Sequence, residues 1–230
     1  MRLGFEADKP VYESIIGELS DKGELKAVLL KRLSGNLQFY AKGEFDVEGF
    51  SACISDMEYN SLISPRSYCD KFLENGLFSK YEEGAIIAKL DRRGIDQCEQ
   101  YPEVEPLRLE DLDQVVELYK KIFSSFSSKE VMEKRLKSGR GRGLCIRHQE
   151  KVVSVVQSEF EESDSALIVG VGTAVDFQGK GLATKCLKAM CKQLAQEGKD
   201  LFLQYDNMDA GRIYENLGFK PIDQVRYYKR

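Results

Sequence analysis

The chain has 230 residues, of which 42% are hydrophobic and 31% are charged, a balance typical of a folded protein and too apolar for a disordered one. Its formal net charge is −4 and it has no long basic block, which argues against nucleic acid as the main partner. No apolar run approaches the roughly 20 residues that a membrane helix needs, so we expect no membrane partner either.

The first part of the chain alternates helix and strand signals. We predict a helix over 9–23, strands over 24–33 and 36–45 with a turn at 34–36, a helix over 46–56, a strand over 60–64, a helix over 65–76 and a strand over 82–90. Residues 92–105 are polar and lose all periodicity. The sequence therefore predicts an α/β domain over 1–92, a linker over 93–103 and a second domain over 104–230.

The second part restarts the alternation. We predict a short strand and a helix within 104–123, a helix over 129–139, strands over 144–149, 151–160 and 165–175, a helix over 180–197, a strand over 200–205, a helix over 208–217 and a strand over 226–230. The three consecutive strands are rich in β-branched residues. The whole chain is accordingly assigned to the mixed α/β (α+β) class.

The cysteines and the single histidine limit the chemistry. Zinc sites usually pair cysteines at CxxC spacing, often with histidines, but no such spacing occurs and His148 is the only histidine. We therefore expect no metal, and a Ser–His–Asp or Cys–His catalytic group is disfavoured for the same reason. Scattered thiols and a start without the apolar core of a signal peptide predict a cytoplasmic protein. The cysteines are Cys53, Cys69, Cys98, Cys145, Cys186 and Cys191.

One glycine-rich stretch, VDFQGKGLATK at 175–185, is a candidate phosphate-binding loop. A Walker loop does not fit, because Ala174 stands where its first glycine belongs and Gly181 replaces its Ser/Thr. A dinucleotide fingerprint starting at Gly170 does not fit either, because Val175 occupies the third glycine position. The remaining candidate is the segment 178–183, between a strand and a helix.

This segment has the chemistry of an anion site. Gly179 and Gly181 let backbone amides approach an anion, and the helix N-terminus adds unpaired N–H groups with a partial positive charge. Lys180, with Lys185 and Lys188 further along, would add full charges. A plain strand–turn–helix with glycines for tight packing remains an equal alternative on these residues alone.

Two motifs in order resemble the GNAT superfamily of N-acyltransferases. Gln178, Gly181 and Ala183 match that family's acyl-CoA loop, Gln/Arg-x-x-Gly-x-Gly/Ala. Downstream, YDNMDAGRIYENLGF is similar to its signature Asn-x-x-Ala-x-x-x-Tyr-x-x-x-Gly-Phe, with Asn207, Ala210, Tyr214, Gly218 and Phe219 in register. The resemblance covers about residues 104–230. It implies a mixed, mostly antiparallel sheet flanked by helices, preceded by a smaller α/β domain that is either a degenerate GNAT-like module or unrelated.

The resemblance also implies a reaction, the transfer of an acetyl group from acetyl-CoA to a primary amine. The backbone N–H of Val171 would polarise the thioester, and Tyr214 would protonate the leaving thiolate. Tyr214 packing on its own helix is the plainer alternative, and Asn207 would cap that helix as well as hold the pantetheine arm. The residues expected to bind acetyl-CoA are Val171, Thr173, Gln178, Gly179, Lys180, Gly181, Leu182, Ala183, Thr184, Asn207, Ala210 and Tyr214.

The acceptor side is less determined by the sequence. Glu159 and Glu161 lie two residues apart near the end of a strand, so both face the same way, and Glu159 is the candidate general base. An exposed carboxylate at a strand end is the commoner situation. The acceptor is expected to be a small amine or a peptide amine. Two rival hypotheses stay open. In the first, the chain is a non-catalytic acyl-CoA sensor. In the second, its N-terminal half is an interaction module, for example one that forms a homodimer.

Overall fold

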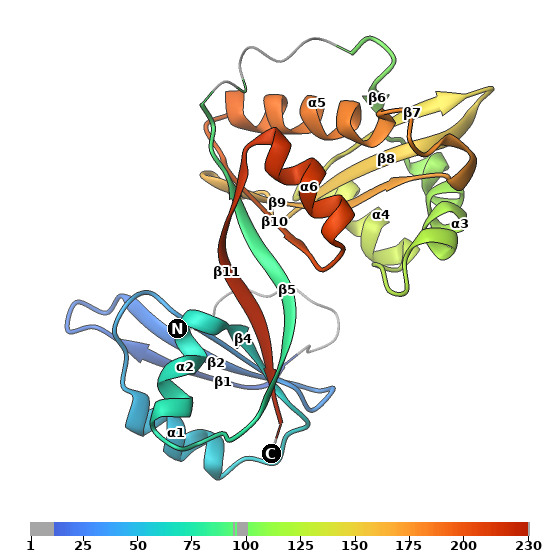
Figure 1. Ribbon diagram of the computed structural model, residues 1–230. Helices are drawn as coiled ribbons and strands as arrows, with labels where there is room; N and C mark the ends of the chain where they lie inside the picture. The colour runs from blue at the N-terminus through green and yellow to red at the C-terminus, as the bar shows by residue number, and fades with distance from the viewer. Residues whose placement is uncertain (1–11, 94, 96–100, 230) are drawn as a thin grey trace. The chain divides into compact units, whose positions relative to one another are not determined.

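The computed structural model describes residues 12–93, 95 and 101–229 and divides the chain into two compact units. Unit 1 comprises residues 1–86 with 223–230, and unit 2 comprises residues 87–222 (Figure 1). Strands β5 (Tyr81–Leu90) and β11 (Phe219–Tyr228) each contribute to both units. The end of the chain therefore groups with unit 1, whereas the expected second domain ran to residue 230. Most of the expected linker lies outside the described residues.

Unit 1 is a sheet with two helices. Its strands follow the order β1-β2-β3-β4-β11, in which β3 and β4 pair in parallel and the other neighbours pair antiparallel. Phe39, Phe72 and Tyr228 are fully buried in its core. The remaining elements are β1 (Tyr12–Leu19), β2 (Leu25–Arg32), β3 (Leu37–Ala41), α1 (Val47–Ser55), β4 (Leu62–Pro65) and α2 (Arg66–Glu74).

The helix expected over residues 9–23 is wrong where the structure describes it. Tyr12–Leu19 form β1 instead, which pairs antiparallel with β2, and its side chains alternate between partly buried and exposed. Alternation with a period of two is the strand pattern, and the adjacent Ile15 and Ile16 favour it because β-branched side chains fit a pleated surface. Pairing with the edge of β2 also satisfies backbone groups of both strands, an effect that no local pattern reports.

Local signals elsewhere in unit 1 are confirmed. Asp46 caps α1, and its carboxylate accepts a hydrogen bond from the backbone N–H of Gly49 at 2.9 Å. Gly35 has φ +82° in the turn between β2 and β3. The helix expected to begin at Pro65 begins directly after it, as the fixed φ of proline and its missing N–H favour.

Unit 2 contains the strands and helices of the second half. Within it, β6–β7, β7–β8 and β8–β9 pair antiparallel, and β9–β10 pair in parallel. The elements are β6 (Glu105–Pro106), η2 (Leu109–Asp111), α3 (Leu112–Ile122), α4 (Lys129–Ser138), β7 (Gly143–His148), β8 (Lys151–Glu159), β9 (Ser165–Thr173), η3 (Val175–Phe177), α5 (Leu182–Gln196), β10 (Asp200–Tyr205) and α6 (Met208–Leu217).

Helices cover both faces of the unit 2 sheet, as Figure 1 shows. Helix α5 packs against β7–β10 through an apolar side that includes Leu187, Met190 and Leu194, all fully buried. Helices α3 and α4 lie on the other face, where Tyr119 and Met132 pack near β8. Strand β8 is thus buried on both sides, which explains its nearly continuous apolar sequence.

Several expectations concern groups spread over the fold. No helix in the described part of the chain is long and apolar enough to cross a membrane. Residues 12–93, 95 and 101–229 contain no group of three or more His, Cys, Asp or Glu that could hold a metal ion. Cys53, Cys69, Cys145, Cys186 and Cys191 are free thiols. Cys98 lies outside the described residues.

Candidate functional site

The loop before α5 owes its shape to two glycines. Gly179 and Gly181 have φ +74° and +73°, a left-handed conformation that side chains disfavour. A Cβ added at either position would meet nothing within 4 Å, so these glycines do not serve tight packing. The space beside them is open, and α5 begins at Leu182 without a side-chain cap. The loop thus presents backbone N–H groups of the first helical turn to an open surface.

Positive charge gathers at this end of α5. The Lys180 ammonium donates a hydrogen bond to the backbone carbonyl of Asp176 at 3.2 Å and lies 4.7 Å from the centre of the Phe177 ring. Lys185, one turn into the helix, forms an ion pair with Glu103 at 2.6 Å. Lys180 therefore supplies the charge nearest to the loop, while that of Lys185 is partly neutralised.

A first cavity, here named the loop cavity, lies beside this loop. It is lined by every residue expected to bind acetyl-CoA except Lys180 and Asn207, joined by Gly172, Phe177, Asp209 and Ile213. Sequence positions as distant as Val171 and Tyr214 thus meet in one cavity. The loop and the second motif, which the sequence related only by their order along the chain, face the same space.

A second cavity, the strand cavity, opens where β9 and β10 diverge. Their parallel pairing ends at Leu203 opposite Ile168, although both strands continue past this point. The strand cavity is lined by residues 168–173 of β9, by residues 203–205 of β10 and by the start of α6, including Asn207. It shares Val171 and Tyr214 with the loop cavity, so the two are continuous along β9.

A bulge at Gly170 and Val171 shapes this part of β9. Val155 pairs with Gly172 and Gln157 with Val169, which leaves one extra residue on β9. Gly170 has φ +60°, and its carbonyl accepts a hydrogen bond from the Tyr119 hydroxyl at 2.6 Å. The backbone around Val171 therefore leaves the regular ladder at the point where the two cavities meet.

Gly170→Ala is expected to destabilise the fold by about 2–4 kcal/mol, because its Cβ would overlap the Tyr119 hydroxyl in a backbone conformation that alanine disfavours. The matched control is Gly139→Ala, at φ +68° with nothing within 4 Å of the added Cβ. It should cost only the backbone part, about 1–2 kcal/mol. Urea unfolding of both variants measures the difference, and equal losses would contradict the close packing at Gly170.

Tyr214 reaches the cavities from α6. Its ring is buried against Tyr205 and Phe219, with ring centres 5.5 and 6.3 Å away, and its hydroxyl has no hydrogen-bond partner among the described residues. Burial raises the pKa of Tyr214 to about 12, so the hydroxyl keeps its proton at neutral pH. Asn207 caps the same helix through hydrogen bonds from the backbone N–H groups of Asp209 and Ala210. The phenol is thus fixed, protonated and free to donate.

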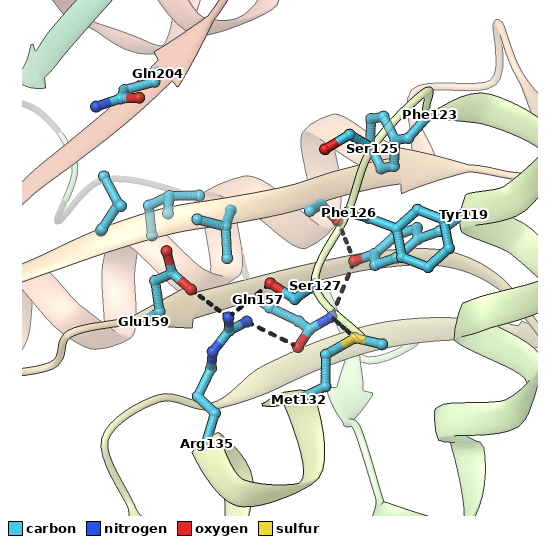
Figure 2. A pocket seen from close by; sticks show the side chains of 14 residues that line it. Tyr119, Phe123, Ser125, Phe126, Ser127, Met132, Arg135, Gln157, Glu159 and Gln204 are labelled. Carbon is cyan, nitrogen blue, oxygen red and sulfur yellow. Dashed lines mark hydrogen bonds and ion pairs between the residues drawn. The ribbon is translucent and has the colours of Figure 1, made fainter. Parts of the chain in front are cut away.

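A third cavity, the aromatic cavity, adjoins the strand cavity on the side of α3 and α4 (Figure 2). Its volume is about 290 Å³, and both cavities share residues 168–170, Phe123 and Gln204. Its other lining residues are Tyr119, Ser125, Phe126, Ser127, Met132, Arg135, Gln157, Glu159 and Leu167. Three aromatic rings from α3 and the segment after it therefore line the same cavity as Gly170.

A chain of polar contacts crosses the floor of the aromatic cavity, as Figure 2 shows. Gln157 donates from Nε2 to the Tyr119 hydroxyl at 3.0 Å, and its Oε1 accepts from Arg135 at 3.5 Å. Arg135 also donates to Ser127 at 3.1 Å and forms an ion pair with Glu159. Burial raises the pKa of Tyr119, whose hydroxyl therefore remains a donor to the Gly170 carbonyl.

The two carboxylates expected near the acceptor separate in the structure. Glu159 lines the aromatic cavity, where it is bound to Arg135. Glu161 lines none of the three cavities; it pairs with Arg142 and accepts a hydrogen bond from Ser158. The strand ends before Glu161, so the alternation that would have put both on one face no longer applies.

Three site residues were not predicted from the sequence: Tyr119, Gln157 and Arg135. Tyr119 was only placed within the region 104–123 expected to hold a short strand and a helix, and the other two drew no assignment. One signal was present: Gln157 interrupts an apolar run, and a polar side chain in a strand buried on both faces must find partners. Its partners come from other elements, so the run alone could not identify them.

Comparison with known proteins shows which sequence family the chain matches. A family model described as GNAT acetyltransferase matches residues 47–228. The match begins within unit 1, so the family pattern is not confined to residues 104–230, over which the two motifs were recognised. No curated protein matches the chain significantly.

Solved structures of low sequence identity share the fold. A GNAT-family acetyltransferase from Colwellia psychrerythraea has 15% identity and a TM-score of 0.69, covering 94% of this chain and 84% of its own. A GCN5-related N-acetyltransferase from Kribbella flavida has 14% identity and a TM-score of 0.64, covering 88% and 86%. One from Sphaerobacter thermophilus has 14% identity and a TM-score of 0.63, covering 98% and 82%. The expected fold class is confirmed.

Proposed function

The chain belongs to the GNAT acetyltransferase family, and we propose on that premise that it transfers an acetyl group from acetyl-CoA directly to a primary amine. One observation carries the proposal: the loop cavity and the strand cavity are continuous, and Val171 and Tyr214 line both. A thioester bound along the loop would have its reacting carbon at this junction. An amine would approach through the diverging strands from the aromatic cavity.

The loop suits the diphosphate of coenzyme A. Open space beside Gly179 and Gly181 lets phosphate oxygens approach the backbone, and the uncapped N-terminus of α5 offers N–H donors with a favourable helix dipole. Lys180 adds a full positive charge at the same place. Asn207, whose Oδ1 is occupied by capping α6, keeps its amide nitrogen for the pantetheine arm.

Bound acetyl-CoA would supply an acyl group already activated as a thioester. The bulge holds the backbone of Val171 outside the regular ladder, which suits a N–H donor to the carbonyl oxygen as that oxygen gains charge. Attack forms a C–N bond and breaks the C–S bond, and the proton lost by the amine must reach the thiolate. These atoms balance without a metal or a covalent enzyme intermediate.

Tyr214 is proposed to donate to the developing thiolate. A thiol has a pKa of about 8.5, well below the pKa of about 12 that burial gives this phenol, so complete proton transfer from Tyr214 alone is uphill. A hydrogen bond from the hydroxyl to sulfur stabilises the negative charge without that transfer. The proton that finally protonates sulfur then comes from the acceptor amine.

The proposed role of Glu159 changes from general base to acceptor binding. Glu159 pairs with Leu167, three residues along β9 from Gly170, and its carboxylate is bound to Arg135. At about 3.3 Å per residue it lies roughly 10 Å from Gly170 and further still from the reacting centre at Val171, beyond direct proton transfer. This position instead suits contact with the far end of an acceptor.

Calorimetric titration with acetyl-CoA, followed by a thiol-release assay with primary amines, tests the proposed function. Saturable binding at one site per chain and amine-dependent release of CoA thiol are the expected results. Binding without release by any amine would favour the alternative of a non-catalytic acyl-CoA sensor. No binding by the folded protein would remove acetyl-CoA from the function altogether.

A further inference from the structure

The aromatic cavity has the size and lining of a small-molecule site. Its volume is about 290 Å³, and half of its lining residues are apolar or aromatic, with a few polar groups among them. One end borders Gly170, where β9 and β10 diverge, and Glu159 and Arg135 lie at the other end (Figure 2). A molecule inside it would therefore reach the proposed reacting centre with one end and meet an ion pair with the other.

Arg135 has little capacity left for an anionic ligand. Its side chain is only 7% exposed, and its guanidinium already donates to Gln157, to Ser127 and to Glu159. A ligand carboxylate would have to displace the carboxylate of Glu159 from a partly buried ion pair. Breaking such a pair leaves a charge without compensation, which is strongly unfavourable.

Glu159, in contrast, keeps one carboxylate oxygen free. Oε2 binds Arg135, whereas Oε1 accepts no hydrogen bond from any described residue, and Figure 2 shows it directed away from Arg135. The ionisable groups lining the aromatic and strand cavities, apart from tyrosines, are Glu159, Asp206 and Arg135. Glu159 and Arg135 balance within the aromatic cavity, and Asp206 of the strand cavity leaves one net negative charge over the two cavities together, which favours a cation.

The aromatic rings lie at the other end of the cavity, where Tyr119 binds the carbonyl of Gly170. Phe123 and Phe126 pack at 5.1 and 5.6 Å from the ring of Tyr119, and all three line the cavity. Aromatic rings and the neighbouring aliphatic side chains suit methylene groups. The lining thus matches an aliphatic chain whose charged end lies at Glu159.

We propose that the acceptor is a small aliphatic diamine or polyamine whose second ammonium binds Glu159 while its neutral amine lies beside Gly170. This inference rests on the proposed function, since it names the substrate class of that site. Three residues of β9 separate the two ends, about 10 Å. An extended chain of bonds of about 1.5 Å needs roughly six to eight methylenes to span this length, so an α-amino acid is too short.

The wild-type protein provides the first test, with 1,6-diaminohexane, hexylamine and 6-aminohexanoate as three acceptors of equal chain length. Calorimetry measures their binding, and thiol release measures their kcat/KM with saturating acetyl-CoA. We expect the diamine to exceed hexylamine at least tenfold in both measurements and 6-aminohexanoate to be the poorest. Equal values for the diamine and hexylamine would overturn the inference, as would a preference for 6-aminohexanoate, which would make Arg135 the anchor.

Two variants test the role of Glu159. Glu159→Gln is expected to abolish the preference for the diamine over hexylamine and to improve binding of 6-aminohexanoate, because Arg135 loses its partner. Glu161→Gln is the matched control, since it removes a neighbouring carboxylate that is also paired with an arginine but lines none of the three cavities. A diamine preference that survives in Glu159→Gln would contradict the inference. If Glu159→Gln fails to fold, the three wild-type acceptors still decide.

The same measurements separate this inference from the proposed function. Acetyl-CoA binding together with equal binding of diamine and monoamine would leave the acetyltransferase standing and reject the diamine. Glu159-dependent binding of the diamine without any binding of acetyl-CoA would retain the cation-binding site at Glu159 and reject the proposed reaction.

Discussion

Gly181→Glu is expected to raise the dissociation constant for acetyl-CoA at least 100-fold. The new side chain would fill the open space beside the loop, and its negative charge would repel the diphosphate at the N-terminus of α5. A 100-fold loss corresponds to about 2.8 kcal/mol of binding free energy, a reasonable value for losing charge-assisted hydrogen bonds. Calorimetric titration with acetyl-CoA measures the effect directly.

Gly198→Glu is the control for this variant. Gly198 follows the other end of α5, has φ +83° and likewise has nothing within 4 Å of an added Cβ. Both substitutions thus carry the same backbone penalty, of about 1–2 kcal/mol, and the same change in charge. Only Gly181→Glu should weaken binding. Equal affinities in the two variants would mean that the loop does not hold the diphosphate.

Tyr214→Phe is expected to slow acetyl transfer by about 100- to 1,000-fold without changing the affinity for acetyl-CoA. Removing the hydroxyl leaves the packing against Tyr205 and Phe219 intact but deletes the proposed donor to the developing thiolate. Single-turnover thiol release gives the rate, and calorimetry gives the affinity. Tyr101→Phe, outside the three cavities, should leave both values unchanged, and an unchanged rate in Tyr214→Phe would remove this hydroxyl from the mechanism.

The pH dependence provides a second measure of Tyr214. Burial disfavours the phenolate and raises the pKa of Tyr214 to about 12. The protonated donor form therefore persists through neutral and moderately alkaline pH and is lost only as the pH approaches that pKa. An ordinary tyrosine has a pKa of about 10. Any loss of activity as the pH rises toward about 10 should therefore not come from ionisation of Tyr214. A descending limb below that pH in wild type that disappears in Tyr214→Phe would contradict the assignment.

Most elements could be predicted because their signals are local. Asp46 at the start of α1, Gly35 in its turn and the glycines before α5 act within a few residues of themselves. The segment around β1 failed for the opposite reason. Its pattern was compatible with a helix, and the strand forms by pairing with β2, an interaction between two segments that propensity does not measure.

The candidate site shows the same division. The loop and the Asn207–Phe219 motif could be recognised because each is a short run with fixed spacing. The floor of the aromatic cavity could not, because Tyr119, Arg135 and Gln157 come from α3, α4 and β8 and meet only in the folded protein. Glu159 was found, but as a base, since its partner Arg135 lies 24 residues earlier in the chain.

The family, the glycine turn before α5 and the place of Tyr214 in its motif could be read from the sequence alone, because short motifs and positive-φ glycines encode their structure locally. Three features became visible only in the folded protein: β9 leaves β10 after Ile168, Tyr119 holds the bulge at Gly170, and Glu159 keeps one free oxygen in the cavity that the aromatic rings also line. These features arise from pairing and packing between distant segments, whose free energy depends on the partner that each side chain meets.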